Sequence, residues 1–174
     1  MSDYLLSGAV TNALNMPSIS AEEAPRLRPF VDLAEKMGLM MGQLLGAPIK
    51  KAEFTYKGEV TKLNTTPMTA AALAGLMKSI MPDVNMVSAP GLAKEAGIEV
   101  KDSYIEEAER AESLIRISLE TLERNYVMVG SIYRGVPRIV RLFGVPMDAT
   151  FAPHMLYVRN EDKPGFIGAL GQIL

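Results

Sequence analysis

A change in hydrophobic periodicity near residue 114 is the feature that most constrains the fold. Before it, apolar residues recur at spacings of three and four over residues 27–45 and 66–81, which predicts two helices with apolar faces. After it, three β-branched or aromatic segments at 114–119, 126–133 and 136–143 follow one another, with turn-forming residues between them. We therefore expect an α+β fold in which helices pack on a mainly antiparallel sheet.

Proline and glycine set the bounds of the remaining elements. Thr66-Pro67 is a favourable helix start, and Pro82 prevents the helix from continuing. Gly144 and Pro146 predict a turn rather than a strand before Phe151. The shorter predicted elements are a strand over 49–56, a buried strand over 84–87, a helix over 90–97 and a strand over 98–100.

Composition excludes several classes of function. The chain has no cysteine, so it contains no disulfide, thiol nucleophile or thiolate metal site, and its single histidine is too few for a histidine-based metal site. The formal net charge is −2 and the basic residues are scattered, so we expect neither nucleic acid nor a membrane as a partner. No apolar run approaches the ~20 residues of a membrane span, and the N-terminus lacks a secretory pattern, which predicts a cytoplasmic protein.

The last twenty residues predict a strand, a polar loop and the first turns of a helix. Apolar residues alternate from Met155, and Phe166, Ile167, Leu170 and Ile173 recur at helical spacing after Pro164-Gly165. The free backbone N–H groups at such a helix start can hold a carboxylate or a phosphate. One strand and one helix cannot bury a core alone, so we expect the chain to be part of a longer protein.

Five short motifs occur in one order along the chain, and in that order they resemble the D-3-phosphoglycerate dehydrogenase family. They are Asn12-Ala-Leu-Asn-Met-Pro17, Leu33-Ala-Glu-Lys-Met-Gly38, Gly91-Leu-Ala-Lys-Glu-Ala-Gly97, Gly130-Ser-Ile-Tyr-Arg-Gly135 and Asn160-Glu-Asp-Lys-Pro-Gly165. The resemblance implies that residues 1–19 leave the catalytic half, that 20–152 form the intervening (allosteric substrate-binding) domain, and that 153–174 are the first βα unit of an incomplete, ferredoxin-like ACT domain.

The resemblance also implies a regulatory and oligomerisation role. The parent enzymes oxidise 3-phosphoglycerate with NAD, in the first step of L-serine biosynthesis. No G-x-G-x-x-G motif follows a strand in this chain. We therefore expect no cofactor and no catalytic residue in this fragment, with NAD bound by the rest of the parent enzyme.

Three arginines around Gly135 are the candidate anion ligands. Guanidinium groups bind phosphate through paired hydrogen bonds and keep their charge at any useful pH. The resemblance places Arg138 where the family has a cationic ligand, and Arg134 and Arg141 are its neighbours in sequence. The chain departs from some relatives at Thr150, where they carry a second cation. From the residues alone, arginines that simply face solvent remain an open alternative.

Asn160 and Asp162 are the candidate effector ligands. The family resemblance implies that polar residues at these positions bind L-serine across an interface between two complete ACT domains. An amide can serve either end of a zwitterion, and a carboxylate can accept from an ammonium group. The alternative is a turn and helix cap, which Asn and Asp favour without any ligand.

Three functions remain in competition at this stage. The first is the regulatory module of phosphoglycerate dehydrogenase, binding a small phosphate ligand and assembling as a homodimer or homotetramer. The second is a stand-alone binding protein of the same fold, or the related domain of an L-serine dehydratase. The third is a structural oligomerisation domain. Self-association is expected because a strand edge at the C-terminus can pair with another chain.

Overall fold

One six-stranded sheet organises the molecule. The computed structural model describes residues 23–106, 113–160 and 164–173. The strand order is β2-β1-β3-β4-β5-β6, with β1 and β2 parallel and every other neighbouring pair antiparallel. The strands are β1 (Ile49–Lys57), β2 (Glu99–Ile105), β3 (Leu114–Thr121), β4 (Asn125–Tyr133), β5 (Val136–Leu142) and β6 (Val145–Thr150). The predicted α+β class with a mainly antiparallel sheet is confirmed.

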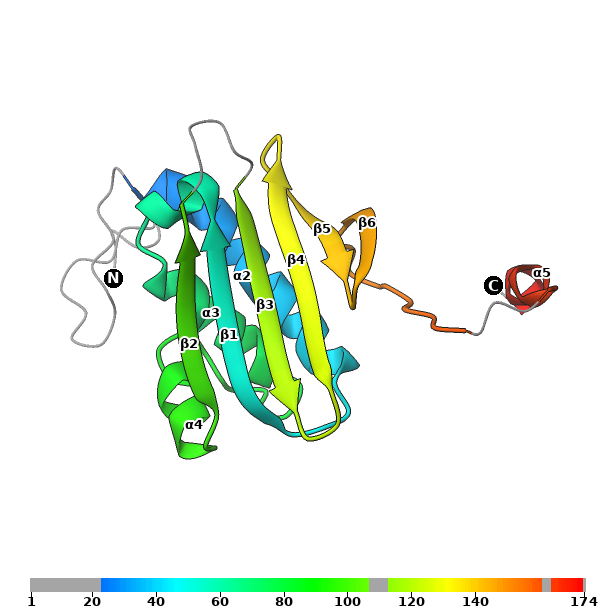
Figure 1. Ribbon diagram of the computed structural model, residues 1–174, viewed down its shortest axis with the longest axis horizontal. Helices are drawn as coiled ribbons and strands as arrows, with labels where there is room; N and C mark the ends of the chain where they lie inside the picture. Colours follow the sequence, from blue (N-terminus) through cyan, green and yellow to red (C-terminus); the bar gives the residue numbers. More distant parts are fainter. Residues whose placement is uncertain (1–22, 107–112, 161–163, 174) are drawn as a thin grey trace.

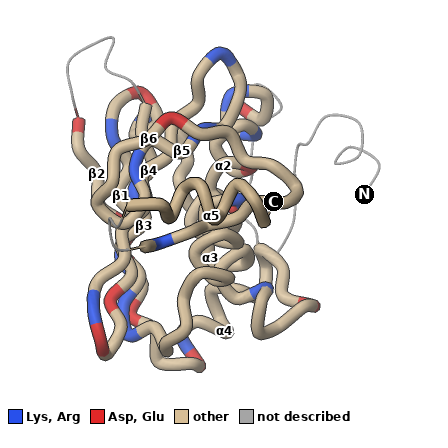
Figure 2. Tube along the Cα trace, turned by 90° about the vertical axis from the view of Figure 1, so that its right-hand side faces the viewer, with Lys and Arg blue, Asp and Glu red and all other residues tan. Residues whose placement is uncertain are grey.

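The helices form a second layer on one side of this sheet. They are α2 (Ala24–Leu44), α3 (Thr66–Met77) and α4 (Ala89–Glu95), with the short 3-10 helix η1 (Gly58–Lys62) after β1. In Figure 1 the strands lie in front and these three α-helices behind them, and Figure 2 shows the same two layers from the side. The other side of the sheet, which we call the open face, carries no described helix.

Alternation along the strands builds the core between the two layers. Phe54 and Tyr56 on β1, and Ile115, Ile117 and Leu119 on β3, are completely or almost completely buried. Their neighbours in sequence point to the open face, as a two-residue period requires.

Helices α2 and α3 approach each other through glycine. A Cβ atom added to Gly38 would lie 2.1 Å from the backbone oxygen of Ala72, and one added to Gly75 would lie 2.3 Å from that of Glu35. Each is far inside van der Waals contact with a backbone atom that cannot rotate away. The small side chains of α3, such as Ala71 and Ala74, extend this close contact, and the helix is buried over most of its length.

Three sequence-based expectations are wrong. Residues 84–87 form no strand but lead into a turn at 86–88, where the Asn85 side chain accepts from the backbone N–H groups of Val87 and Ser88. Residues 145–150 form β6 rather than a continued turn. The reversal is confined to Phe143 and Gly144, whose φ angles of 49° and 89° suit a two-residue hairpin, and Pro146 is tolerated because β6 is an edge strand.

The third concerns the C-terminal segment. Residues 155–160 form no strand, since they pair with none of the described strands. The predicted helix that follows is present as α5 (Phe166–Ile173), and none of its residues is buried. Figure 1 shows α5 apart from the sheet, joined to it by the segment after β6.

Among the described residues, none of the helices combines the length and the apolar character that crossing a membrane requires.

Candidate anion-binding site on the open face

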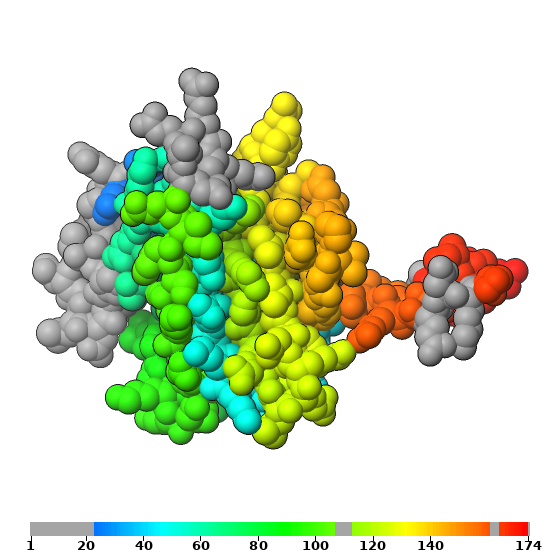
Figure 3. Space-filling view, viewed as in Figure 1, coloured from blue at the N-terminus to red at the C-terminus, as the bar shows by residue number. Residues whose placement is uncertain are grey.

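The register of the sheet identifies which side chains share the open face. Gly130 faces the helices, because an added Cβ would meet Met37 and Leu33 on α2. Its strand neighbours Val129 and Ser131 therefore point to the open face. Arg138 pairs with Ser131, and Arg141 pairs with Val129, so both arginines lie on that face (Figure 3 views the molecule from this side).

A β-bulge explains how two arginines three residues apart can share one face. In a regular strand, residues 138 and 141 would point in opposite directions. The register between β4 and β5 shifts at Val129/Gly130, which leaves Val140 as an extra residue on β5. The bulge restores Arg141 to the side of Arg138. It also lets Ile139 and Leu142 both face the core, where they are buried.

Arg138 lies among polar and aromatic groups on three strands. Its Nη1 donates to Asp148 Oδ2 on β6 at 2.9 Å, and its guanidinium carbon lies 5.7 Å from the centre of the Tyr133 ring. Thr150 is directly opposite Arg138 on β6. Thr150, the position at which the sequence departs from the family pattern, therefore lies beside Arg138, the predicted anion ligand. The ion pair is open to solvent, with the Asp148 side chain 69% exposed, so it contributes little net stability.

Arg134 reaches the same tyrosine from the hairpin turn. Arg134 and Gly135 have φ angles of 50° and 79° and form the two-residue turn between β4 and β5. The Arg134 guanidinium carbon lies 5.3 Å from the centre of the Tyr133 ring. The structure thus brings Arg134 and Arg138 to one aromatic side chain that is half exposed.

Arg141 has a different neighbour. Val129 pairs with Arg116 on β3 and with Arg141 on β5, so the two arginines flank one valine on the open face. Arg116 also donates from Nε to Ser118 Oγ at 3.1 Å. Arg116, Tyr133 and Asp148 were not predicted from the sequence as site residues. Only the strand register places them, although the Tyr-Arg-Gly sequence at a turn was a local signal.

The other half of the open face has paired charges. Lys51 Nζ lies 2.7 Å from Glu99 Oε1, and this carboxylate raises the pKa of Lys51. Lys101 lies 3.7 Å from Glu53, and a hydrogen bond donated by Ser103 lowers the pKa of Glu53. On the β3–β5 side of the face Arg138 is paired with Asp148, whereas Arg116 and Arg141 take part in none of the ion pairs between described residues.

The candidate effector residues are not brought to the arginine cluster. Asp162 lies outside the described residues. Asn160 is exposed at the end of the segment after β6, and it lines a cavity that Arg141 also lines but Arg138 and Arg134 do not. Whether either residue binds an amino acid stays a prediction.

A half-buried polar cluster lies at the opposite edge of the sheet, on its helix-facing side. Thr69 Oγ1 is 2.9 Å from each carboxylate oxygen of Asp102 and 2.7 Å from Tyr56 Oη. Burial raises the pKa of Asp102 and that of Tyr56. The Tyr104 ring stacks on Tyr56 with ring centres 5.9 Å apart, and its hydroxyl is 2.9 Å from Thr65 Oγ1. Within the described residues, no group of acidic or histidine side chains is arranged to hold a metal ion.

Fold and site together define a small α+β domain with a helix-covered face and an open, arginine-bearing face. Residues 26–143, more than half of the chain, match the family model of the D-3-phosphoglycerate dehydrogenase intervening domain. The chain belongs to this family.

Several longer proteins named D-3-phosphoglycerate dehydrogenase are similar to this chain. The D-3-phosphoglycerate dehydrogenase of Archaeoglobus fulgidus is 34% identical over 165 residues, which are 94% of this chain and 31% of that protein. The enzyme of the same name from Bacillus subtilis is 30% identical over 170 residues, 95% of this chain and 32% of its own. The D-3-phosphoglycerate dehydrogenase of Methanocaldococcus jannaschii is 32% identical over 160 residues, which are 90% of this chain and 30% of that protein. The chain thus spans about a third of the length of these relatives.

Proposed function

We propose that this chain is a regulatory part of a D-3-phosphoglycerate dehydrogenase and that Arg138 is the main ligand of a phosphate-bearing anion. The observation that carries the proposal is the bulge at Val140, which keeps Arg138 and Arg141 on the same open face. Arg134 supplies a further guanidinium beside Tyr133. Guanidinium groups presented together on one face suit a dianion.

The geometry around Arg138 leaves it able to take a ligand. Arg138 uses one N–H group toward Asp148, while a guanidinium carries five. An incoming phosphate can bind the remaining donors or displace the exposed carboxylate. The Tyr133 ring, contacted by both Arg134 and Arg138, limits where the two guanidinium groups can move.

The relatives' name suggests the setting in which such a site acts. In a complete enzyme of this name, NAD-dependent oxidation of 3-phosphoglycerate would take place in parts beyond this chain. A bound phosphate would regulate that activity only if it bound two quaternary states with different affinity. L-serine binding at Asn160 and Asp162, self-association and a cytoplasmic location belong to the same proposal.

A structural role without a ligand is the second candidate. The ion pair between Arg138 and Asp148 favours a structural role, because a carboxylate of the chain already binds one N–H group of the guanidinium. The absence of a second cation at Thr150, opposite Arg138, points in the same direction.

Calorimetric titration of this chain with inorganic phosphate and 3-phosphoglycerate tests the proposal. Arg138→Ala should weaken binding by about tenfold or more, as expected for loss of a charge-assisted hydrogen bond. Asp148→Asn should strengthen binding, because it removes the competing carboxylate. Arg28→Ala, an exposed change on α2, is the matched control. Absence of binding by a folded wild-type chain would favour the structural role.

A further inference from the structure

A cavity of about 1340 Å³ lies between α2, strands β4–β6 and residues 155–160, which we call the linker. It meets the proposed phosphate site only at Arg141, since neither Arg134 nor Arg138 lines it. Its volume exceeds the roughly 300–1,000 Å³ of ordinary small-molecule pockets. Space therefore does not restrict a ligand here, and the chemistry of the walls decides which ligand fits.

The charged side chains that line this cavity are all positive. Four arginines contribute to it, and no aspartate, glutamate or lysine does. They are Arg116, Arg124, Arg141 and Arg159. None of the four forms an ion pair within the described residues. In a chain of net charge −2, this concentration of positive charge attracts an anion.

Three aromatic rings form a continuous wall of the cavity. The Tyr126 and Phe143 ring centres are 5.2 Å apart at 72°, and those of Phe143 and Tyr157 are 5.6 Å apart at 89°. The Arg124 guanidinium carbon lies 4.6 Å from the centre of the Tyr126 ring. Since aromatic rings pack favourably edge to face or offset-stacked, a further planar ring can extend this wall.

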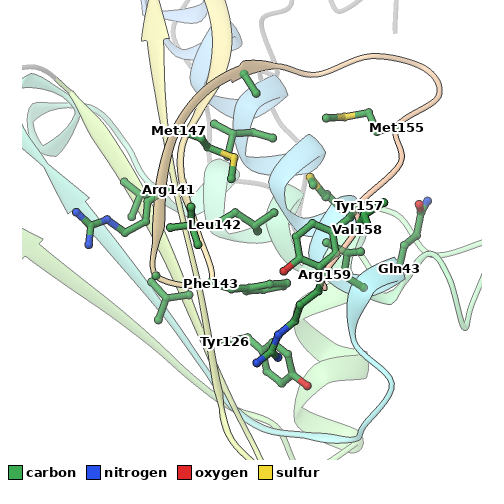
Figure 4. Close-up of a pocket in the computed structure, with 18 of the residues that line it drawn as sticks. Gln43, Tyr126, Arg141, Leu142, Phe143, Met147, Met155, Tyr157, Val158 and Arg159 are labelled. Carbon is green, nitrogen blue, oxygen red and sulfur yellow. The ribbon is translucent and has the colours of Figure 1, made fainter. Parts of the chain in front are cut away.

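The linker contributes one end of this wall. Figure 4 shows Tyr157 and Arg159 on the same side of β5 as Phe143 and Tyr126, whereas the Arg141 side chain points away from these rings. Arg124 and Arg159 are therefore the cations best placed beside the aromatic wall. Arg116 and Arg141 belong to the rim of the cavity, on the open face.

Phe143 is held in an unusual backbone conformation at the centre of the wall. Its φ angle of 49° lies in the left-handed region, which bulky L-residues rarely adopt. The two-residue turn between β5 and β6 requires this conformation. Here the conformation places the Phe143 ring in contact with both Tyr126 on the sheet and Tyr157 on the linker.

We propose that this cavity binds a small aromatic anion, a planar ring that carries a carboxylate or a phosphate. The ring packs against Phe143 and its two tyrosine neighbours, and the anionic group is held by Arg124 and Arg159. Because Arg124 belongs to the β3–β4 turn and Arg159 to the linker, the bound molecule connects the sheet to the segment that leads to α5.

Calorimetric titration of this chain tests the proposal with two probes, indole-3-acetate as an aromatic carboxylate and adenosine 5′-monophosphate as an aromatic phosphate. Acetate and inorganic phosphate are controls without a ring, and adenosine is a control without charge. We expect at least one aromatic anion to bind more tightly than its matched controls. Arg124→Gln and Arg159→Gln should each weaken binding of that aromatic anion by about tenfold.

Further variants distinguish this site from the proposed phosphate site. Tyr157→Leu should weaken binding of the aromatic anion and leave binding of inorganic phosphate unchanged. Arg138→Ala should weaken binding of inorganic phosphate and leave binding of the aromatic anion unchanged. The proposal is overturned if neither probe binds at millimolar concentration, or if adenosine binds as tightly as the monophosphate. Binding that survives in the double variant of Arg124 and Arg159 would overturn it as well.

Discussion

The two faces of the sheet place opposite demands on the sequence. On the helix-covered face, Phe54, Ile117 and Met128 are completely buried, and glycines let α2 and α3 approach within backbone contact. On the open face, the same strands carry arginines and valines that no described helix covers. One face therefore specifies the fold, and the other is free to carry charge without a packing penalty. The comparison predicts that the two faces respond differently to substitution.

Truncating a core side chain should have the largest effect. Phe54→Ala leaves a cavity between the sheet and the helices, and we expect it to lower the free energy of unfolding by about 3–5 kcal/mol. Thr55→Ala, the next residue on the same strand but on the open face, should cost less than about 1 kcal/mol. Urea unfolding followed by circular dichroism measures both. Similar losses for the two variants would contradict the division between the faces.

The helix contact gives the next largest effect. Gly38→Ala forces a methyl group against the Ala72 backbone oxygen, and we expect a loss at the upper end of about 1–3 kcal/mol. Gly91→Ala on α4 is the matched control, because nothing lies within 4 Å of its added Cβ. It should be neutral or stabilise by about 0.5–1 kcal/mol, since alanine favours a helix over glycine. The urea midpoints of the two variants should therefore move in opposite directions.

Arginine substitutions on the open face should change binding but not folding. Arg138→Ala removes an exposed ion pair, so we expect a change in unfolding free energy of less than about 0.5 kcal/mol. Phosphate affinity should nevertheless fall in the titration described above. A large loss of stability in this variant would mean that the arginine supports the fold, and the comparison of the faces would have to be revised.

The smallest expected effect is a pH dependence at the β2 edge. Burial raises the pKa of Asp102, so the folded state favours the protonated carboxyl more than the unfolded state does. The cost of ionising Asp102 is absent at pH values below both pKa values and grows as the pH rises from the unfolded-state pKa through the folded-state pKa.

Asp102→Asn removes this ionisation. The stability of the variant relative to wild type should therefore rise as the pH increases across the acidic range, in urea unfolding repeated at several pH values. Glu95→Gln, an exposed change at the end of α4, is a suitable comparison. A difference between Asp102→Asn and wild type that does not change with pH would contradict the assignment.

The sequence predicted the helix-covered face better than the open face. Apolar spacing located α2, α3 and strands β1, β3, β4 and β5, because burial imposes a period that can be read from one chain. It failed at residues 84–87, where the Asn85 side chain competes for the backbone, and at β6, where Gly144 and Pro146 concealed an edge strand.

The candidate site depended on information that the local sequence does not contain. Arg138 could be singled out through the family resemblance, but its contact with Asp148 requires the register of β5 and β6. The bulge at Val140 has no side-chain signature, so the common face of Arg138 and Arg141 was not predictable. Arg116 is brought to Arg141 only by the pairing of three strands.

A nuclear magnetic resonance titration of the ¹⁵N-labelled chain with 3-phosphoglycerate shows which residues of the open face contact the ligand. We expect the amide signals that shift to belong to the β4–β5 hairpin around Arg134, to Arg138 and Arg141, and to Asp148–Thr150 on β6. Signals from α2 and α3 should stay in place. Absence of shifts from the open face, or shifts concentrated on the helices, would contradict the assignment of ligand binding to this face.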